Sequence, residues 1–172
     1  MGDEMLIRTE RLVLRRAVID DLGAMHRVLS DERAMRFWST PPHSSQKETE
    51  SWLRSMIDAP RAVSHDFVVE LDGMVIGKAG CWRLPEIGFI LHPEHWRRGL
   101  MREALRAVIE STFSNHPVPE IMADVDPRNI ASLQLLRQLG FAQTGSAART
   151  WFVDDVWCDS VYLALPRDAW VG

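Results

Sequence analysis

Residues 86–101 read Glu-Ile-Gly-Phe-Ile-Leu-His-Pro-Glu-His-Trp-Arg-Arg-Gly-Leu-Met, and this stretch decides the fold. The apolar run 86–91 predicts a short buried strand, and the side chains at 101, 104, 105, 108 and 112 follow one face of an amphipathic helix. A strand that passes through a short loop into a helix leaves the first N–H groups of that helix unpaired, and such groups suit a pyrophosphate. Gly99 would let the backbone approach a phosphate closely, and Arg97 or Arg98 would add positive charge.

The composition of the chain narrows its class. With 172 residues, we expect one domain over residues 1–172. The net charge of -4 argues against a broad nucleic-acid surface. Cys81 and Cys158 sit in no metal-binding spacing, so we expect no metal site and assign both thiols to packing. The acidic start Met1–Glu4 precedes no apolar signal segment, and no apolar run could span a bilayer, which predicts a cytoplasmic protein that binds no membrane.

The remaining periodicity predicts a mixed α+β chain. A capping box at Ser45–Glu48 starts one helix, Asp72-Gly73 marks a hairpin turn, and tandem proline at 41–42 interrupts the preceding helix. The expected order is strand 6–16, helix 20–35, helix 46–58, strands 66–71, 74–82 and 86–91, helix 99–116, strand 120–125, helix 129–139, and strands 141–145 and 151–165.

A second motif lies in the helix predicted over 129–139. It runs from Asn129-Ile-Ala-Ser132 to Leu139-Gly140-Phe141. Asn129 is a good N-cap, and Gly140 is typical of a helix end. These local roles are compatible with a further, ligand-binding role for Asn129.

The two motifs together resemble the GNAT superfamily of N-acetyltransferases, in the branch of the ribosomal-protein N-terminal acetyltransferases. Residues 96–101 fall on the Gln/Arg-x-x-Gly-x-Gly/Ala loop of that superfamily, and the similarity also includes residues 9–15, 86–89 and 129–141. Trp96 stands where much of the superfamily has Gln or Arg, and Met101 stands where Gly or Ala is usual. Since main-chain N–H groups hold the phosphates, neither change prevents binding, although Met101 would narrow the pocket.

This resemblance implies a fold, a co-substrate and a reaction. It implies the acyl-CoA N-acyltransferase fold, a mostly antiparallel sheet flanked by helices with a splayed central strand pair. It further implies acetyl-CoA as co-substrate, direct attack by a primary amine in a ternary complex, and a protein N-terminus or small-molecule amine as acceptor. The sequence leaves the oligomeric state open, with a homodimer among the alternatives. The implied cofactor-binding residues are Ile90, Leu91, Arg97, Arg98, Gly99, Leu100, Met101, Asn129 and Ser132.

The catalytic groups are less well marked. The resemblance implies that main-chain N–H groups near Ile90 and Leu91 stabilise the oxyanion. Glu86 would act as general base directly or through water, or else it is a surface carboxylate. The family's usual tyrosine position is Leu136, so Ser132 or a water would protonate the thiolate, and the sole tyrosine, Tyr162, is no obvious replacement. We expect His92 and His95 to be solvent-facing loop residues.

Aromatic residues suggest where the acceptor binds. The family builds its acceptor pocket from the first two helices and the last hairpin, although aromatic residues at such spacings also pack cores. Those residues here are Phe37, Trp38, Trp52, Trp82, Trp151 and Trp157. The alternative function is a non-catalytic acyl-CoA-binding or regulatory module. A Walker-type nucleotide site is disfavoured, because neither lysine, Lys47 or Lys78, lies in a Gly-Lys-Ser/Thr context.

Overall fold

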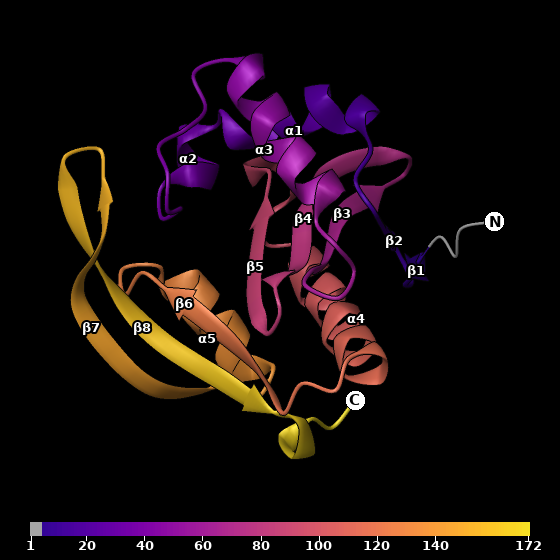
Figure 1. Cartoon of the computed structure of the whole chain (residues 1–172), viewed down its shortest axis with the longest axis vertical. Coiled ribbons are helices and arrows are strands. Elements are labelled where there is room, and N and C mark those ends of the chain that lie inside the picture. Colours follow the sequence, from indigo (N-terminus) through magenta and orange to yellow (C-terminus); the bar gives the residue numbers. More distant parts are fainter. Residues whose placement is uncertain (1–4) are drawn as a thin grey trace.

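One mixed sheet organises the chain. A computed structural model describes residues 5–172, so the acidic start Met1–Glu4 lies outside the described residues. The eight-stranded sheet has the order β1-β2-β3-β4-β5-β6-β8-β7 (Figure 1). The strands are β1 (Ile7–Arg8), β2 (Leu12–Arg15), β3 (His65–Leu71), β4 (Met74–Arg83), β5 (Glu86–Leu91), β6 (Glu120–Val125), β7 (Ala142–Val153) and β8 (Val156–Pro166). Neighbours pair antiparallel except β5 and β6, which run parallel.

The parallel pair is splayed, as the sequence predicted. β5 and β6 share a single register pair, Glu86 with Met122, next to a bond of 2.9 Å from the Met122 N–H to the Pro85 carbonyl oxygen. Figure 1 shows the two strands diverging from this point. The backbone groups on the facing edges of β5 and β6 are therefore free of each other along most of both strands.

Helices cover both faces of the sheet. They are α1 (Leu22–Leu29), α2 (Glu32–Met35), α3 (Gln46–Asp58), α4 (Leu100–Asn115) and α5 (Ile130–Gln138). One apolar core joins α4 and α5 to the sheet through residues such as Leu105, Ile109 and Leu136. A second core joins α1–α3 to the other face through Met25, Leu53 and Val68. These two cores hold the sheet between two helical layers.

The first predicted strand and the first predicted helix are each divided. Residues 6–16 form two strands, because the Thr9 N–H donates to the Leu12 carbonyl oxygen at 3.0 Å and closes a turn between them. The helix predicted over 20–35 breaks after Leu29, since the Asp31 carboxylate accepts bonds from the N–H groups of Arg33 and Ala34 and caps a new helix.

Other boundaries match closely. α3, β5 and β6 have the predicted bounds, and Ser45 Oγ accepts the Glu48 N–H as an N-cap. β6 alternates buried and exposed residues, so it is half-exposed and not simply buried. The region predicted as two strands over 141–145 and 151–165 is a long hairpin, in which β7 runs unbroken to Val153 and Asp154-Asp155 form the turn with positive φ.

Candidate active site

The loop before α4 presents unpaired main-chain donors. Gly99 is the N-cap of α4, has φ of +73° and supplies no side-chain cap. The first main-chain bond of the helix joins the Glu103 N–H to the Gly99 carbonyl oxygen at 3.1 Å, so the N–H groups at 100–102 have no helical partner. Residues 96–99 are exposed. This geometry fits a pyrophosphate held by backbone donors at the positive end of a helix.

Two side chains hold that loop in place. Arg11 Nη1 donates to the Arg98 carbonyl oxygen at 2.9 Å, and Arg11 Nε donates to Glu103 Oε2 at 2.7 Å. Trp96 Nε1 donates to the Leu91 carbonyl oxygen at 2.8 Å and joins the loop to the end of β5. Trp96, which stands where much of the superfamily has Gln or Arg, therefore has a structural role, because its indole N–H fixes the loop to the strand.

The carboxyl end of β5 presents one main-chain N–H group to the gap between β5 and β6. The His92 N–H donates to the Ile76 carbonyl oxygen on β4 at 2.9 Å. Because N–H groups alternate along a strand, the Ile90 N–H also faces β4, and the Leu91 N–H faces the gap toward β6. Of the two residues suggested for the oxyanion, Leu91 has the suitable direction.

Asn129 is the N-cap of α5. Its Oδ1 accepts the Ser132 N–H at 3.2 Å, and its side-chain amide N–H groups have no partner among residues 5–172. The local role and the binding role are thus compatible, because the oxygen caps the helix while the amide N–H groups stay available. Ser132 lies in the first turn of α5 and does not line the cavity described next.

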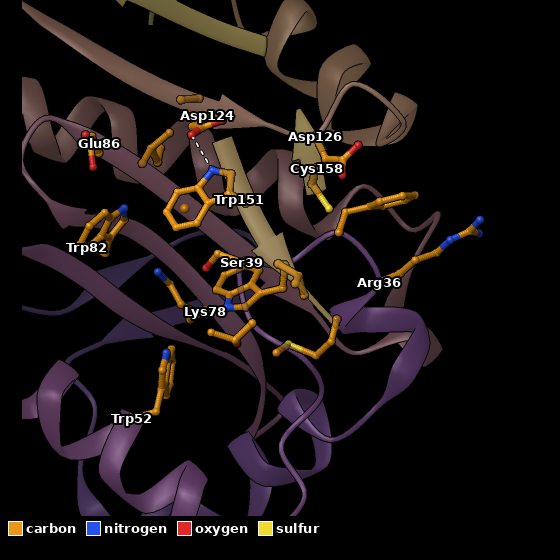
Figure 2. A pocket seen from close by; sticks show the side chains of 18 of the residues that line it. Arg36, Ser39, Trp52, Lys78, Trp82, Glu86, Asp124, Asp126, Trp151 and Cys158 are labelled. Carbon is orange, nitrogen blue, oxygen red and sulfur yellow. Dashed lines mark hydrogen bonds between the residues drawn. The ribbon is translucent and has the colours of Figure 1, made fainter. Parts of the chain in front are cut away.

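A cavity of about 1250 Å³ lies between the α2–α3 region, the β4–β5 hairpin, β6 and the β7–β8 hairpin (Figure 2). Its aromatic walls are Phe37, Trp38, Trp52, Trp82 and Trp151. Trp157, the sixth aromatic residue that we assigned to the acceptor pocket, is not among the lining residues and packs against Phe152 with ring centroids 5.1 Å apart.

Charged side chains line the same cavity. Glu86 is half-buried at the start of β5, and Arg83 Nη2 donates to both of its carboxylate oxygens at 3.1 Å. Asp124 on β6 accepts the Trp151 Nε1 proton at 3.0 Å, as Figure 2 shows. A cleft with aromatic walls and carboxylates is suited to bind and deprotonate an amine.

Comparison with known proteins agrees with this geometry. Residues 11–142 match the family model described as an acetyltransferase (GNAT) domain. The chain belongs to the GNAT acetyltransferase family. The GNAT chain is an acyltransferase. One relative is an uncharacterized N-acetyltransferase, p20, of Bacillus licheniformis. It is 27% identical to this chain over 80% of this chain and 82% of its own length. The [ribosomal protein uS5]-alanine N-acetyltransferase of Escherichia coli is 34% identical, over 49% of this chain and 43% of its own length.

Solved structures share the GNAT fold. A ribosomal L7/L12 alpha-N-protein acetyltransferase in complex with coenzyme A has a TM-score of 0.84 at 19% identity, covering 95% of this chain and 99% of that one. A spermidine N-acetyltransferase from Vibrio cholerae in complex with CoA and spermine has a TM-score of 0.80 at 21% identity, covering 94% and 98%. These likenesses establish the architecture.

Four assignments change around this site. His92 is buried near Asp31, not solvent-facing, and its Nδ1 accepts the Glu94 N–H at 3.4 Å as the cap of the 3-10 turn at 93–95. His95 is only half-exposed, and its Nε2 is buried. Tyr162, which we set aside, lines the cavity, and so does Cys158, whose Sγ lies 3.4 Å from Arg128 Nη2.

Within residues 5–172, no group of three His, Cys, Asp or Glu side chains is arranged to hold a metal ion. Across the same part of the chain, every helix is too short or too polar to cross a membrane.

Sequence reasoning missed the charged residues of the cavity other than Glu86, and three of them matter most here. Asp66 and Lys78 form an ion pair on its floor, and Asp124 lies on β6. Lys78 had a visible signal, since it is the one charged residue in the apolar run 75–81. Asp66 and Asp124 had none, because their position depends on how the strands are ordered in the sheet.

Proposed function

We propose that this GNAT chain transfers the acetyl group of acetyl-CoA to a primary amine by direct attack in a ternary complex. The observation that carries the proposal is that the uncapped start of α4 and the carboxylate-lined cavity lie at the two ends of β5, the splayed strand. The relatives support it, since one acetylates an alanine of a ribosomal protein and one solved structure holds CoA with spermine.

The start of α4 and the N-cap of α5 would hold the CoA moiety. The N–H groups of Gly99, Leu100 and Met101 would bind the pyrophosphate, with Arg97 and Arg98 adding positive charge at the exposed loop. The amide N–H groups of Asn129, with Ser132 beside it, would bind the pantetheine arm.

Glu86 would prepare the acceptor for attack. Its carboxylate takes a proton from the ammonium, directly or through water, and the neutral nitrogen then bonds to the acetyl carbon. The Leu91 N–H stabilises the negative charge on the carbonyl oxygen. The oxyanion collapses and the carbon–sulfur bond breaks. The attacking nitrogen loses its second proton, and the leaving thiolate takes up a proton from the acid, which gives the N-acetyl amine and CoA.

Two hydroxyl groups compete for the role of acid. Ser132 is on α5 outside the cavity lining, whereas Tyr162 is half-buried on β8 and lines the cavity. A phenol is a stronger acid than an aliphatic hydroxyl group. Tyr162→Phe tests the phenol, since loss of the acid lowers kcat without weakening CoA binding. Ser132→Ala is compared with it through kcat at saturating CoA, because Ser132 also lies beside the proposed pantetheine contact.

Glu86→Gln tests the proposed base. Turnover with an accepted amine should fall about 10²-fold or more near neutral pH, and the loss should shrink at alkaline pH as the amine becomes neutral by itself. CoA affinity should not change.

Glu50→Gln is the matched control. Glu50 also pairs with an arginine, Arg54, and its side chain is 39% exposed against 37% for Glu86, but it lies outside the cavity. Wild-type turnover of Glu86→Gln across the pH range would overturn the assignment. Intact CoA binding without turnover of any amine by the wild-type chain would favour the non-catalytic module.

A further inference from the structure

A buried ion pair forms part of the cavity floor. Lys78 Nζ on β4 lies 2.8 Å from Asp66 Oδ2 on β3, and the two side chains are 2% and 5% exposed. Both residues line the cavity, and Figure 2 shows the Lys78 ammonium directed into it. Burying two charges is costly, so a pair retained at this depth calls for an explanation beyond stability.

The hydrogen-bonding groups of this ion pair are not all paired. Among residues 5–172, Asp66 is the sole partner of the Lys78 ammonium, which has three N–H donors. Asp66 Oδ1 is buried and has no hydrogen-bond partner in the same part of the chain. Buried polar groups in proteins are nearly always paired, so the free donors of Lys78 call for an acceptor that residues 5–172 do not supply.

The other cations of the cavity are already engaged or lie at its rim. Arg83 binds the Glu86 carboxylate, Arg128 binds the Asp126 carboxylate at 2.6 Å, and the exposed Arg36 lies over the Phe37 ring. Lys78 is therefore the buried cation with donors left for an anion.

Gly88 leaves the space beside Lys78 open. A Cβ at Gly88 would lie 3.7 Å from Lys78 Nζ and 3.5 Å from Trp82 Cδ1. Gly88 follows Glu86 by two residues on β5, so both face the same side of the sheet. A ligand over Gly88 would thus lie between the Lys78 ammonium and the proposed base.

We propose that Lys78 binds a carboxylate of the acetyl acceptor, and that the acceptor is an α-amino acid with a large apolar side chain. The proposal rests on the proposed acetyl transfer. In an α-amino acid, one carbon separates amine and carboxylate, so a carboxylate on Lys78 places the amine over Gly88 toward Glu86. Trp38, Trp52 and the buried methionines Met35 of α2 and Met56 of α3 provide apolar walls for the side chain.

Lys78 also selects against other amines. A polyamine that entered the cavity carries no acceptor for the free donors of Lys78, so those donors would stay buried and unpaired. Asp66 keeps the ammonium in place and leaves the pair neutral, so an added carboxylate meets an oriented donor.

Three acceptors that differ at one group test the proposal. Phenylalanine, phenylalaninamide and 2-phenylethylamine share the phenyl ring and the primary amine. At the carbon next to the amine, they carry a carboxylate, a neutral amide and a hydrogen, respectively. The kcat/KM for phenylalanine should be about 10- to 100-fold higher than for the other two compounds, because one charge-assisted hydrogen bond contributes about that factor. Each is assayed at several pH values, because their amines differ in basicity.

Lys78→Met should abolish this preference, and Lys47→Met, which removes the chain's other lysine from the exposed face of α3, should retain it. Lys78→Met leaves Asp66 as an unpaired buried carboxylate, so the double variant Asp66→Asn/Lys78→Met is tested beside it. Calorimetric binding of the three compounds to the CoA complex supplies a readout that needs no turnover.

The outcomes separate this inference from the proposed function. Lys78-dependent binding of phenylalanine without any acetylated product would support the carboxylate site and overturn acetyl transfer. Acetylation of all three compounds at equal rates, or a phenylalanine preference that survives in both variants, would overturn the carboxylate site and leave acetyl transfer standing. The carboxylate site would also be overturned if phenylalanine failed to bind, or if spermidine were acetylated faster than phenylalanine.

Discussion

Gly99→Ala should weaken CoA binding by about 10- to 100-fold, the loss expected for one charge-assisted hydrogen bond to phosphate. Gly99 has φ of +73°, and a Cβ there would meet only Arg11 Nη2 at 3.6 Å. Steric crowding in the free protein is therefore absent, and the cost is the left-handed backbone itself, about 1–2 kcal/mol for an alanine. Relief of that strain would turn the N–H groups of the α4 start away from the ligand.

Gly73→Ala is a control with the same backbone cost. Gly73 has φ of +80° in the β3–β4 turn, and a Cβ there would meet nothing within 4 Å. Both variants should lower the melting temperature by about 2–8 °C. Calorimetric titration with CoA should separate them, because only Gly99→Ala should lose affinity. Equal CoA affinity in the two variants would refute the placement of the phosphates at this loop.

Three further predictions concern other parts of the chain. Burial lowers the pKa of His65 from 6.5 to about 4, so the unfolded chain binds a proton in this range that the folded chain does not. The free energy of unfolding should therefore fall as the pH drops from 6.5 toward 4, and His65→Gln should show a smaller fall in pH-dependent melting. Burial raises the pKa of the Cys81 thiol to about 12, so a thiol reagent should modify only Cys158 in the native protein and both residues after unfolding. Arg11→Met should weaken CoA binding about 3- to 10-fold by releasing the Arg98 carbonyl, with a stability change under about 1 kcal/mol, because the Arg11 ion pair is partly exposed. CoA affinity equal to wild type would refute this role.

Local sequence patterns predicted much of the fold. The apolar run 86–91 and the capping residues around Ser45 each act within a few residues, and their elements have the predicted bounds. The strand over 120–125 also has the predicted bounds, but it was expected to be buried and instead alternates buried and exposed residues. The splay between β5 and β6 followed from the family resemblance, whereas the phosphate loop followed from the strand, short loop and helix start within residues 86–101. The division of residues 6–16 was not predicted, because the bonds of Thr9 that close the turn outweigh the alternation of the segment.

The parts of the site that depend on distant contacts could not be predicted. The buried pair of Asp66 and Lys78 joins two strands, and the bond from Trp151 to Asp124 joins residues 27 positions apart. The burial of His92 depends on packing near Asp31, 3.9 Å away. The roles of Glu86 and Ser132, a cytoplasmic location and a homodimer stay predictions.

The central claim is that the chain binds acetyl-CoA at the start of α4. The most direct measurement is the melting temperature of the wild-type chain as acetyl-CoA is titrated, with ATP and NAD as controls. A ligand at 100 times its Kd stabilises the folded state by about 2.7 kcal/mol, which corresponds to roughly 5–11 °C for a domain of this size. We predict a saturable rise of this order with acetyl-CoA and a much smaller one with ATP or NAD. A folded sample that shows no rise with acetyl-CoA, or an equal rise with ATP, would contradict the account.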